Sequence, residues 1–185
     1  MAITRIPHGT LADLLAHTTI AEEDRETSDL IGRLAHVKYD HALSRAEFLD
    51  ICYWKSPRST HHCKKNSSPS IKRTSQEVFR TPNEERKMEL LTTLSGVSVP
   101  TASAILTLTN PTRYGVIDIR VWQLLHTLGA VRRNPRGQGF TIAHWLEYLE
   151  LLRAAAKEAN VRVRLVELTL FTYHRNHQAG TLYRT

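Results

Sequence analysis

The chain turns at one short stretch, Leu94-Ser95-Gly96-Val97-Ser98, which continues as Val99-Pro100-Thr101-Ala102-Ser103-Ala104-Ile105-Leu106. Glycine adopts a positive φ without strain, so Gly96 permits a tight turn. Proline is favoured in the first turn of a helix, so Pro100 indicates that a new helix begins there. The small residues that follow allow two helices to approach closely. The stretch therefore predicts a pair of helices joined by a hairpin.

Such a hairpin has two possible roles. The backbone amides around Gly96 and Ser98, together with the first N–H groups of the following helix, can point at one phosphate. Alternatively, the hairpin is an αα-turn that only folds the core. The hairpin pattern by itself leaves both roles open.

The sequence around the hairpin is almost free of acids. Between Glu89 and Glu147 the single carboxylate is Asp118. The same stretch contains five arginines: Arg113, Arg120, Arg132, Arg133 and Arg136. Basic surroundings suit a phosphate and should lower the pKa of Asp118, which keeps it ionised. A lone carboxylate also suits the stabilisation of a developing positive charge. Together these features indicate an enzyme that acts on the sugar of a nucleic acid.

Helical signals fill most of the remaining chain. Helix starts are predicted at residues that favour the N-cap position, namely Thr10, Ser44, Thr81 and Asp118. Residues 56–68, which are rich in Ser, His and Asn, should form a loop. Residues 161–165 alternate like a strand, but no partner strand is evident elsewhere, so we predict a helix there. The predicted fold class is all-α.

The composition limits the possible partners and cofactors. The chain has 185 residues with a net charge of +7, which favours a polyanionic partner. It has no run of about 18 apolar residues, so we expect no membrane span. Cys52 and Cys63 are too few for an iron–sulfur cluster, which needs about four thiolates. We therefore expect a cytoplasmic protein, nucleoid-associated if bacterial, with no Fe–S cluster and no other cofactor.

Residues 86–128 resemble the helix-hairpin-helix DNA glycosylase superfamily, the HhH-GPD proteins. Leu94-Ser95-Gly96-Val97-Ser98 matches the family's hairpin, and Thr101-Ala102 matches the start of its second helix. Asn110-Pro111-Thr112-Arg113-Tyr114-Gly115 provides the loop that follows. Val116-Ile117-Asp118-Ile119-Arg120-Val121-Trp122 is similar to the aspartate segment, closest to the Asp-x-His-x-Trp form of 8-oxoguanine glycosylases. The rest of the chain agrees in being helical and of suitable length.

The resemblance implies two helical lobes that flank a cleft. Residues 44–113 would form a helical barrel lobe that ends in the hairpin, and residues 1–43 and 114–185 would form the second lobe. A modified or damaged base would be flipped from double-stranded DNA into the cleft. Asp118 would stabilise the oxocarbenium-like sugar while water hydrolyses the N-glycosidic bond. We thus expect a DNA glycosylase of base-excision repair that acts as a monomer.

Two departures from the family pattern narrow the expected reaction. Bifunctional members carry a catalytic lysine immediately before the Thr/Val-Ala pair, where this chain has Pro100. Members with an iron–sulfur cluster carry a C-terminal set of cysteines, which this sequence lacks. Both departures indicate a monofunctional glycosylase without a cluster.

The resemblance also suggests which residues contact DNA. The candidates for DNA contact are Lys55, Arg58, Gly96, Ser98, Thr101 and Arg120. Tyr53 and Trp54 fall where the superfamily places the residue that fills the gap left by a flipped base. Trp54 also suits a core position, as do Trp122 and Trp145. Lys64 and Lys65 belong to residues 51–76, which contain no acid, and should face either phosphate or solvent.

Several alternatives remain. Lys55 could act as a Schiff-base nucleophile, which would make the protein a bifunctional glycosylase/AP lyase. The chain could also be a non-catalytic helix-hairpin-helix DNA-binding protein, although such a protein has no need of an acid facing phosphate. His61-His62-Cys63 lacks a nearby carboxylate or second thiolate, so we expect no metal there. Alkylated purines, oxidised purines and hypermodified phage bases are all possible substrates.

Overall fold

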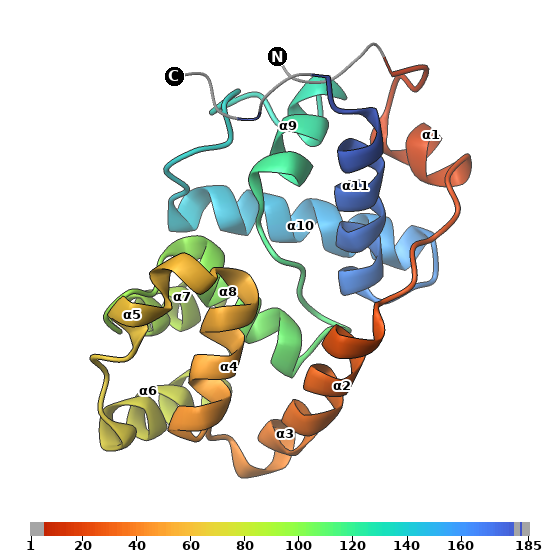
Figure 1. The fold of residues 1–185 in the computed structure, drawn as a ribbon. Coiled ribbons are helices and arrows are strands. Elements are labelled where there is room, and N and C mark those ends of the chain that lie inside the picture. The colour runs from red at the N-terminus through yellow and green to blue at the C-terminus, as the bar shows by residue number, and fades with distance from the viewer. Residues whose placement is uncertain (1–5, 180–181, 183–185) are drawn as a thin grey trace.

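The computed structural model describes residues 6–179 and 182 (Figure 1). The regular elements of this described part are helices, so the predicted all-α class is confirmed. In chain order they are α1 (Leu11–Ala16), α2 (Arg25–Arg33), η1 (Leu34–His36), α3 (Val37–Asp40), α4 (Arg45–Lys55), η2 (Pro57–Ser59), α5 (Thr60–Cys63), α6 (Ser68–Arg80), α7 (Glu84–Thr92), α8 (Val99–Thr109), α9 (Ile119–Thr127), α10 (Ile142–Glu158) and α11 (Val163–His177).

Side-chain caps explain most of the helix starts. Thr10, Ser44 and Asp118 each cap the helix that follows them, as predicted. The start of α7 differs from the prediction, because Asn83 and not Thr81 is its N-cap. The Asn83 side chain accepts the backbone N–H three residues further on at 2.8 Å. The Thr81 hydroxyl instead accepts the N–H of Asn83 at 3.2 Å and shapes the turn before the helix.

Residues 56–68 do not form the loop that their composition predicts, because η2 and α5 lie within them. This segment is held against the hairpin turn. The Asn66 side chain donates to the carbonyl of Ser95 and accepts its N–H, each at 2.9 Å. Cys63 is fully buried, and its thiol donates to the carbonyl of Gly96 at 3.6 Å. Contacts with the hairpin turn, about thirty residues further along the chain, thus stabilise helices where the local composition predicts a loop.

The C-terminal prediction of a helix is confirmed, because α11 begins at Val163 although the residues around it alternate like a strand. Two backbone contacts place its start. The N–H of Arg164 donates to the carbonyl of Pro111 at 3.0 Å, and the N–H of Val163 donates to that of Thr112 at 3.4 Å. The beginning of α11 is therefore fixed to the loop that leads to Asp118.

The helices are arranged around α10, which crosses the middle of the molecule (Figure 1). It contacts α7 and α8 on one side and α11 on the other. Trp122 and Trp145 are fully buried, as expected, and belong to one continuous hydrophobic cluster. Members of this cluster come from both predicted lobes, and the lobe boundary near residue 113 stays a prediction. Every helix in the described part of the chain is too short or too polar to cross a bilayer.

Candidate active site

The segment that carries Asp118 is fixed by buried hydrogen bonds to two helices. The carbonyl of Val116 accepts the hydroxyl of Tyr148, on α10, at 2.8 Å. The N–H of Ile117 donates to the hydroxyl of Ser103, on α8, at 3.1 Å. Asp118 then caps α9, where its Oδ1 accepts a backbone N–H two residues further on at 3.0 Å. These bonds hold the carboxylate in one place.

Lys55, the last residue of α4, forms an ion pair with Asp118. Its Nζ lies 2.9 Å from Oδ2, and the two side chains are 17% and 20% exposed. Burial opposes ionisation of Asp118, but the charge of Lys55 and the hydrogen bonds to the carboxylate outweigh it, so the pKa of Asp118 lies below its usual value. The lowered pKa was predicted. The sequence pointed to the nearby arginines as its cause, whereas Lys55 supplies the largest favourable charge.

The ion pair lies between two hollows of the surface. The first has a volume of about 420 Å³, and its walls include Trp54, Lys55, Asp118, Glu167, Phe171 and Arg175. The second has a volume of about 590 Å³ and lies against the hairpin, with walls that include Lys55, Ser98, Pro100, Thr101, Asp118 and Gln138. Both volumes fall in the range of small-molecule binding sites. The carboxylate is thus accessible from a pocket with aromatic walls and from the surface that carries the hairpin.

The first pocket has a buried charged wall that sequence analysis missed. Arg164 donates to both carboxylate oxygens of Glu23 at 2.8 Å and also to Glu167. Glu167 accepts the N–H of Val116 at 3.3 Å, and its burial raises its pKa even though the charge of Arg164 acts against that change. The guanidinium of Arg164 also lies 5.4 Å from the centre of the Trp54 ring. Because Glu23 is 141 residues from Arg164, no local sequence pattern could have indicated this wall.

The hairpin turn has the predicted geometry, with Gly96 at φ +77°. It also packs more tightly than expected. A Cβ at this position would lie 2.7 Å from the Cβ of His62 and 2.8 Å from the backbone N of Cys63. Substitution of Gly96 would therefore disturb the fold as well as any DNA contact. The first turn of α8 has no side-chain cap, and the hydroxyl of Ser98 instead lies 3.2 Å from that of Thr101. Pro100 has no N–H and the N–H of Ala102 donates to the carbonyl of Ser98 at 2.8 Å, so the N–H groups left for an outside acceptor are those of Val99 and Thr101, two buried residues.

The two candidates for filling the gap in DNA lie in different places. Tyr53 is 61% exposed, which is unusual for a large apolar side chain. Trp54 points inward, because its indole N–H donates to the hydroxyl of Thr27 at 2.9 Å and its ring lines the first pocket. Of the two, Tyr53 therefore has the freedom that this role requires, and Trp54 is part of the pocket wall.

The two remaining candidates for DNA contact, Arg58 and Arg120, have different surroundings. Arg58 is exposed on η2. Arg120 is half-buried, and its guanidinium contacts the side-chain oxygen of Gln178 and lies 5.7 Å from the centre of the Phe171 ring. Contact of Arg120 with phosphate would require these interactions to rearrange. His174 is fully buried, and burial and the charge of Arg120 lower its pKa to about 4.

His61, His62 and Cys63 do not converge on one point. His61 and His62 are exposed, and the centroids of their imidazole rings lie 3.8 Å apart. Cys63 is buried and directed at the hairpin turn. The thiol therefore contributes to the packing of α5 against the hairpin.

Comparison with known proteins gave no match. No family model, no curated protein and no solved structure matches this chain.

The exposed lysines beside the hairpin offer a test of DNA contact. Lys64 and Lys65 directly precede Asn66, which is bonded to the hairpin turn, so we expect both to lie on the same surface as the free N–H groups of α8. Replacing both by glutamine should reduce the slope of log Kd against log salt by about one to two, because each phosphate contact releases counterions. Fluorescence anisotropy of a labelled duplex at several salt concentrations would measure this slope.

A matched control is the double variant Lys38→Gln and Lys157→Gln, which has the same change of charge. Both residues are exposed, on α3 and near the end of α10. Equal slopes for the two double variants would show that Lys64 and Lys65 only face solvent.

Proposed function

We propose that this protein is a DNA glycosylase that removes a modified or damaged base by hydrolysing its N-glycosidic bond. The observation that carries this proposal is the position of Asp118. It is an ionised, immobilised carboxylate that lines a pocket of about 420 Å³ and also faces the hairpin surface. The resemblance of residues 86–128 to the helix-hairpin-helix glycosylases supports the same reaction.

The proposed role of Asp118 follows from the charge that develops during the reaction. Cleavage of an N-glycosidic bond builds positive charge on the sugar, and a carboxylate held nearby stabilises it without having to reorganise. The ion pair with Lys55 keeps Asp118 deprotonated. A water molecule beside the Asp118 carboxylate would then attack C1′ of the sugar.

The DNA would lie across the hairpin. The free N–H groups at the start of α8 suit a phosphate. Exposed cations on the neighbouring segment, including Arg58, Lys64 and Lys65, suit the adjoining backbone. Tyr53, which is exposed two residues before Lys55, suits the gap left in the duplex by a flipped base.

The pocket would hold the flipped base between aromatic and acidic side chains. Trp54 and Phe171 offer surfaces for stacking. The wall also carries the carboxylates of Glu22 and Asp24, both exposed. Carboxylates favour a base that is positively charged or that presents N–H donors. We therefore expect alkylated or donor-rich purines to be better substrates than bases that present only acceptors.

A screen of end-labelled duplexes, each with one lesion, would test the proposal. Excision of at least one lesion is expected, with an abasic site as the product. If the protein binds every duplex tightly and excises no base, it is a non-catalytic helix-hairpin-helix DNA-binding protein and the proposal is wrong.

One observation favours a second reaction. Lys55 Nζ lies 2.9 Å from Asp118, where an amine could also reach C1′ of the sugar. Attack by an amine would form an imine and lead to strand cleavage, as in a glycosylase/AP lyase. An ammonium group has no lone pair with which to attack, however, and the Lys55 ammonium is held in the ion pair with Asp118. We therefore expect water to be the nucleophile.

Borohydride trapping distinguishes the two reactions. With wild-type protein and substrate, we expect no covalent protein–DNA adduct and a strand that breaks only after hot alkali. An adduct that disappears in Lys55→Gln but persists in Lys38→Gln would instead identify Lys55 as the nucleophile. The reaction would then be bifunctional.

A further inference from the structure

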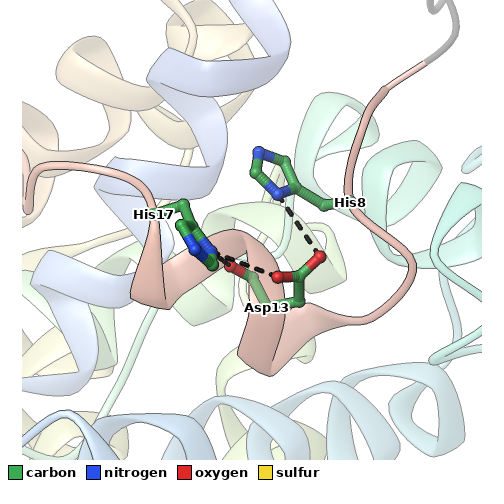
Figure 2. Close-up of side chains that lie close together, drawn as sticks. All are labelled: His8, Asp13 and His17. Carbon is green, nitrogen blue, oxygen red and sulfur yellow. Dashed lines mark hydrogen bonds and ion pairs between the residues drawn. The ribbon is translucent and has the colours of Figure 1, made fainter.

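The first helix carries a cluster of potential metal ligands that has no part in the proposed reaction. His8 precedes α1, Asp13 lies on it and His17 ends it. Figure 2 shows each of the two imidazole rings next to a different oxygen of the Asp13 carboxylate. One ligand atom from each residue lies within 4.8 Å of the other two. Two imidazoles and a carboxylate are a set of ligands that Zn²⁺ accepts.

The distances in the cluster are close to those of a zinc site. With Zn–N and Zn–O bonds of about 2.0–2.2 Å, tetrahedral geometry places neighbouring ligand atoms about 3.3 Å apart. His17 Nδ1 is already 3.1 Å from one oxygen of Asp13, and His8 Nδ1 is 3.4 Å from the other. The two imidazoles contact different oxygens of Asp13, so binding one ion requires them to approach each other and the carboxylate to turn one oxygen, or both, toward the ion. The side chain of His17 is 67% exposed and that of Asp13 is 40% exposed, so both can rotate without a change in the fold.

Neighbouring contacts would support such a site. The N–H of Gly9 donates to the Asp13 carboxylate at 3.2 Å, which orients it. The ring of His8 stacks on that of His17, with centroids 5.8 Å apart, and meets the edge of Tyr173 on α11 at 5.9 Å. Binding through Nδ1 of His17 would cost one hydrogen bond, since this atom lies 2.9 Å from the carbonyl of Asp13.

We propose that His8, Asp13 and His17 bind one Zn²⁺ ion, with water completing the coordination. This site is separate from the one around Asp118 and does not depend on the proposed glycosylase activity. Its effect would be structural, because the ion would fasten the segment before α1 to the end of that helix. Through the contact of His8 with Tyr173, the same ion would stabilise the position of α1 against α11.

The test is titration calorimetry of the untagged protein with ZnCl₂ in a buffer free of chelators. We expect one site per chain, weakened about tenfold or more in Asp13→Asn and in His17→Gln. The control is the double variant His61→Gln and His62→Gln, which removes two exposed histidines from another surface. This variant should bind Zn²⁺ as tightly as the wild type.

Thermal unfolding provides a second measurement for variants that fold less well. Zn²⁺ should raise the unfolding midpoint of the wild type and of the His61/His62 control, and should not raise that of His17→Gln. The proposal is wrong if the wild type binds no Zn²⁺ at about 100 µM, which corresponds to only about 5 kcal/mol of binding free energy. It is equally wrong if His17→Gln binds as tightly as the wild type, or if the control loses as much affinity as His17→Gln.

Discussion

Replacing Asp118 by asparagine is expected to lower the rate of base excision by about 100- to 1,000-fold, because a preorganised charge at the reacting centre contributes about that much. Asparagine keeps the size and the helix-capping ability of the side chain. DNA binding should be unchanged or tighter, since the variant no longer repels phosphate. Single-turnover excision and duplex affinity, measured on the same preparation, would separate the two effects.

The control for this variant is Asp50→Asn, which makes the same change of charge at an exposed position on α4. It should leave excision within about twofold of wild type, because surface changes away from special features have small effects. A folded Asp118→Asn protein that excises bases at the wild-type rate would remove Asp118 from the mechanism.

The pKa of Asp118 also predicts how excision depends on pH. Because its pKa lies below its usual value, the carboxylate stays ionised as the pH falls toward the ordinary range of aspartate. Protonation of Asp118 should therefore cause no loss of activity between about pH 5 and 8. A rate that falls with an apparent pKa near 6, and no longer does so in Asp118→Asn, would show that the site raises this pKa instead.

Replacing Arg164 by methionine is expected to destabilise the protein by about 3–5 kcal/mol, because it leaves buried carboxylates without their partner. Arg164 is 5% exposed, and Glu167 beside it is 2% exposed. The loss should be smaller at acidic pH. Without Arg164, the buried Glu167 has a folded-state pKa above its unfolded-state pKa, because burial opposes its ionisation. The protein is therefore most stable below the unfolded-state pKa of Glu167, and it loses stability as the pH rises through the folded-state pKa. Urea unfolding at two pH values would measure both effects.

The matched control is Arg162→Met, two residues earlier at an exposed position where the side chain forms no cap hydrogen bond. It should change stability by no more than about 0.5 kcal/mol. If Arg164→Met is no less stable than this control, the charged wall does not contribute to the stability of the fold.

The sequence alone determined the features that depend on neighbouring residues. Caps at Thr10 and Ser44 and the hairpin glycine at position 96 could be recognised because each acts on the backbone within a few residues. Asp118 stood out for the same kind of reason, as the single carboxylate in a long basic stretch and a suitable N-cap. The cap predicted at Thr81 lay two residues from the true one, because both side chains can accept backbone N–H groups.

Only the tertiary structure decided which side chains meet at the site. Lys55 and Asp118 are 63 residues apart in the sequence, and Glu23 and Arg164 are 141 residues apart. No local periodicity or spacing in the sequence therefore indicates either pair. The helix within residues 56–68 likewise depends on contacts with the hairpin turn. Local patterns specify where helices start and stop, whereas the pocket and its charges arise when helices far apart in the sequence bury their faces against one another, and the packing then determines which polar groups must pair.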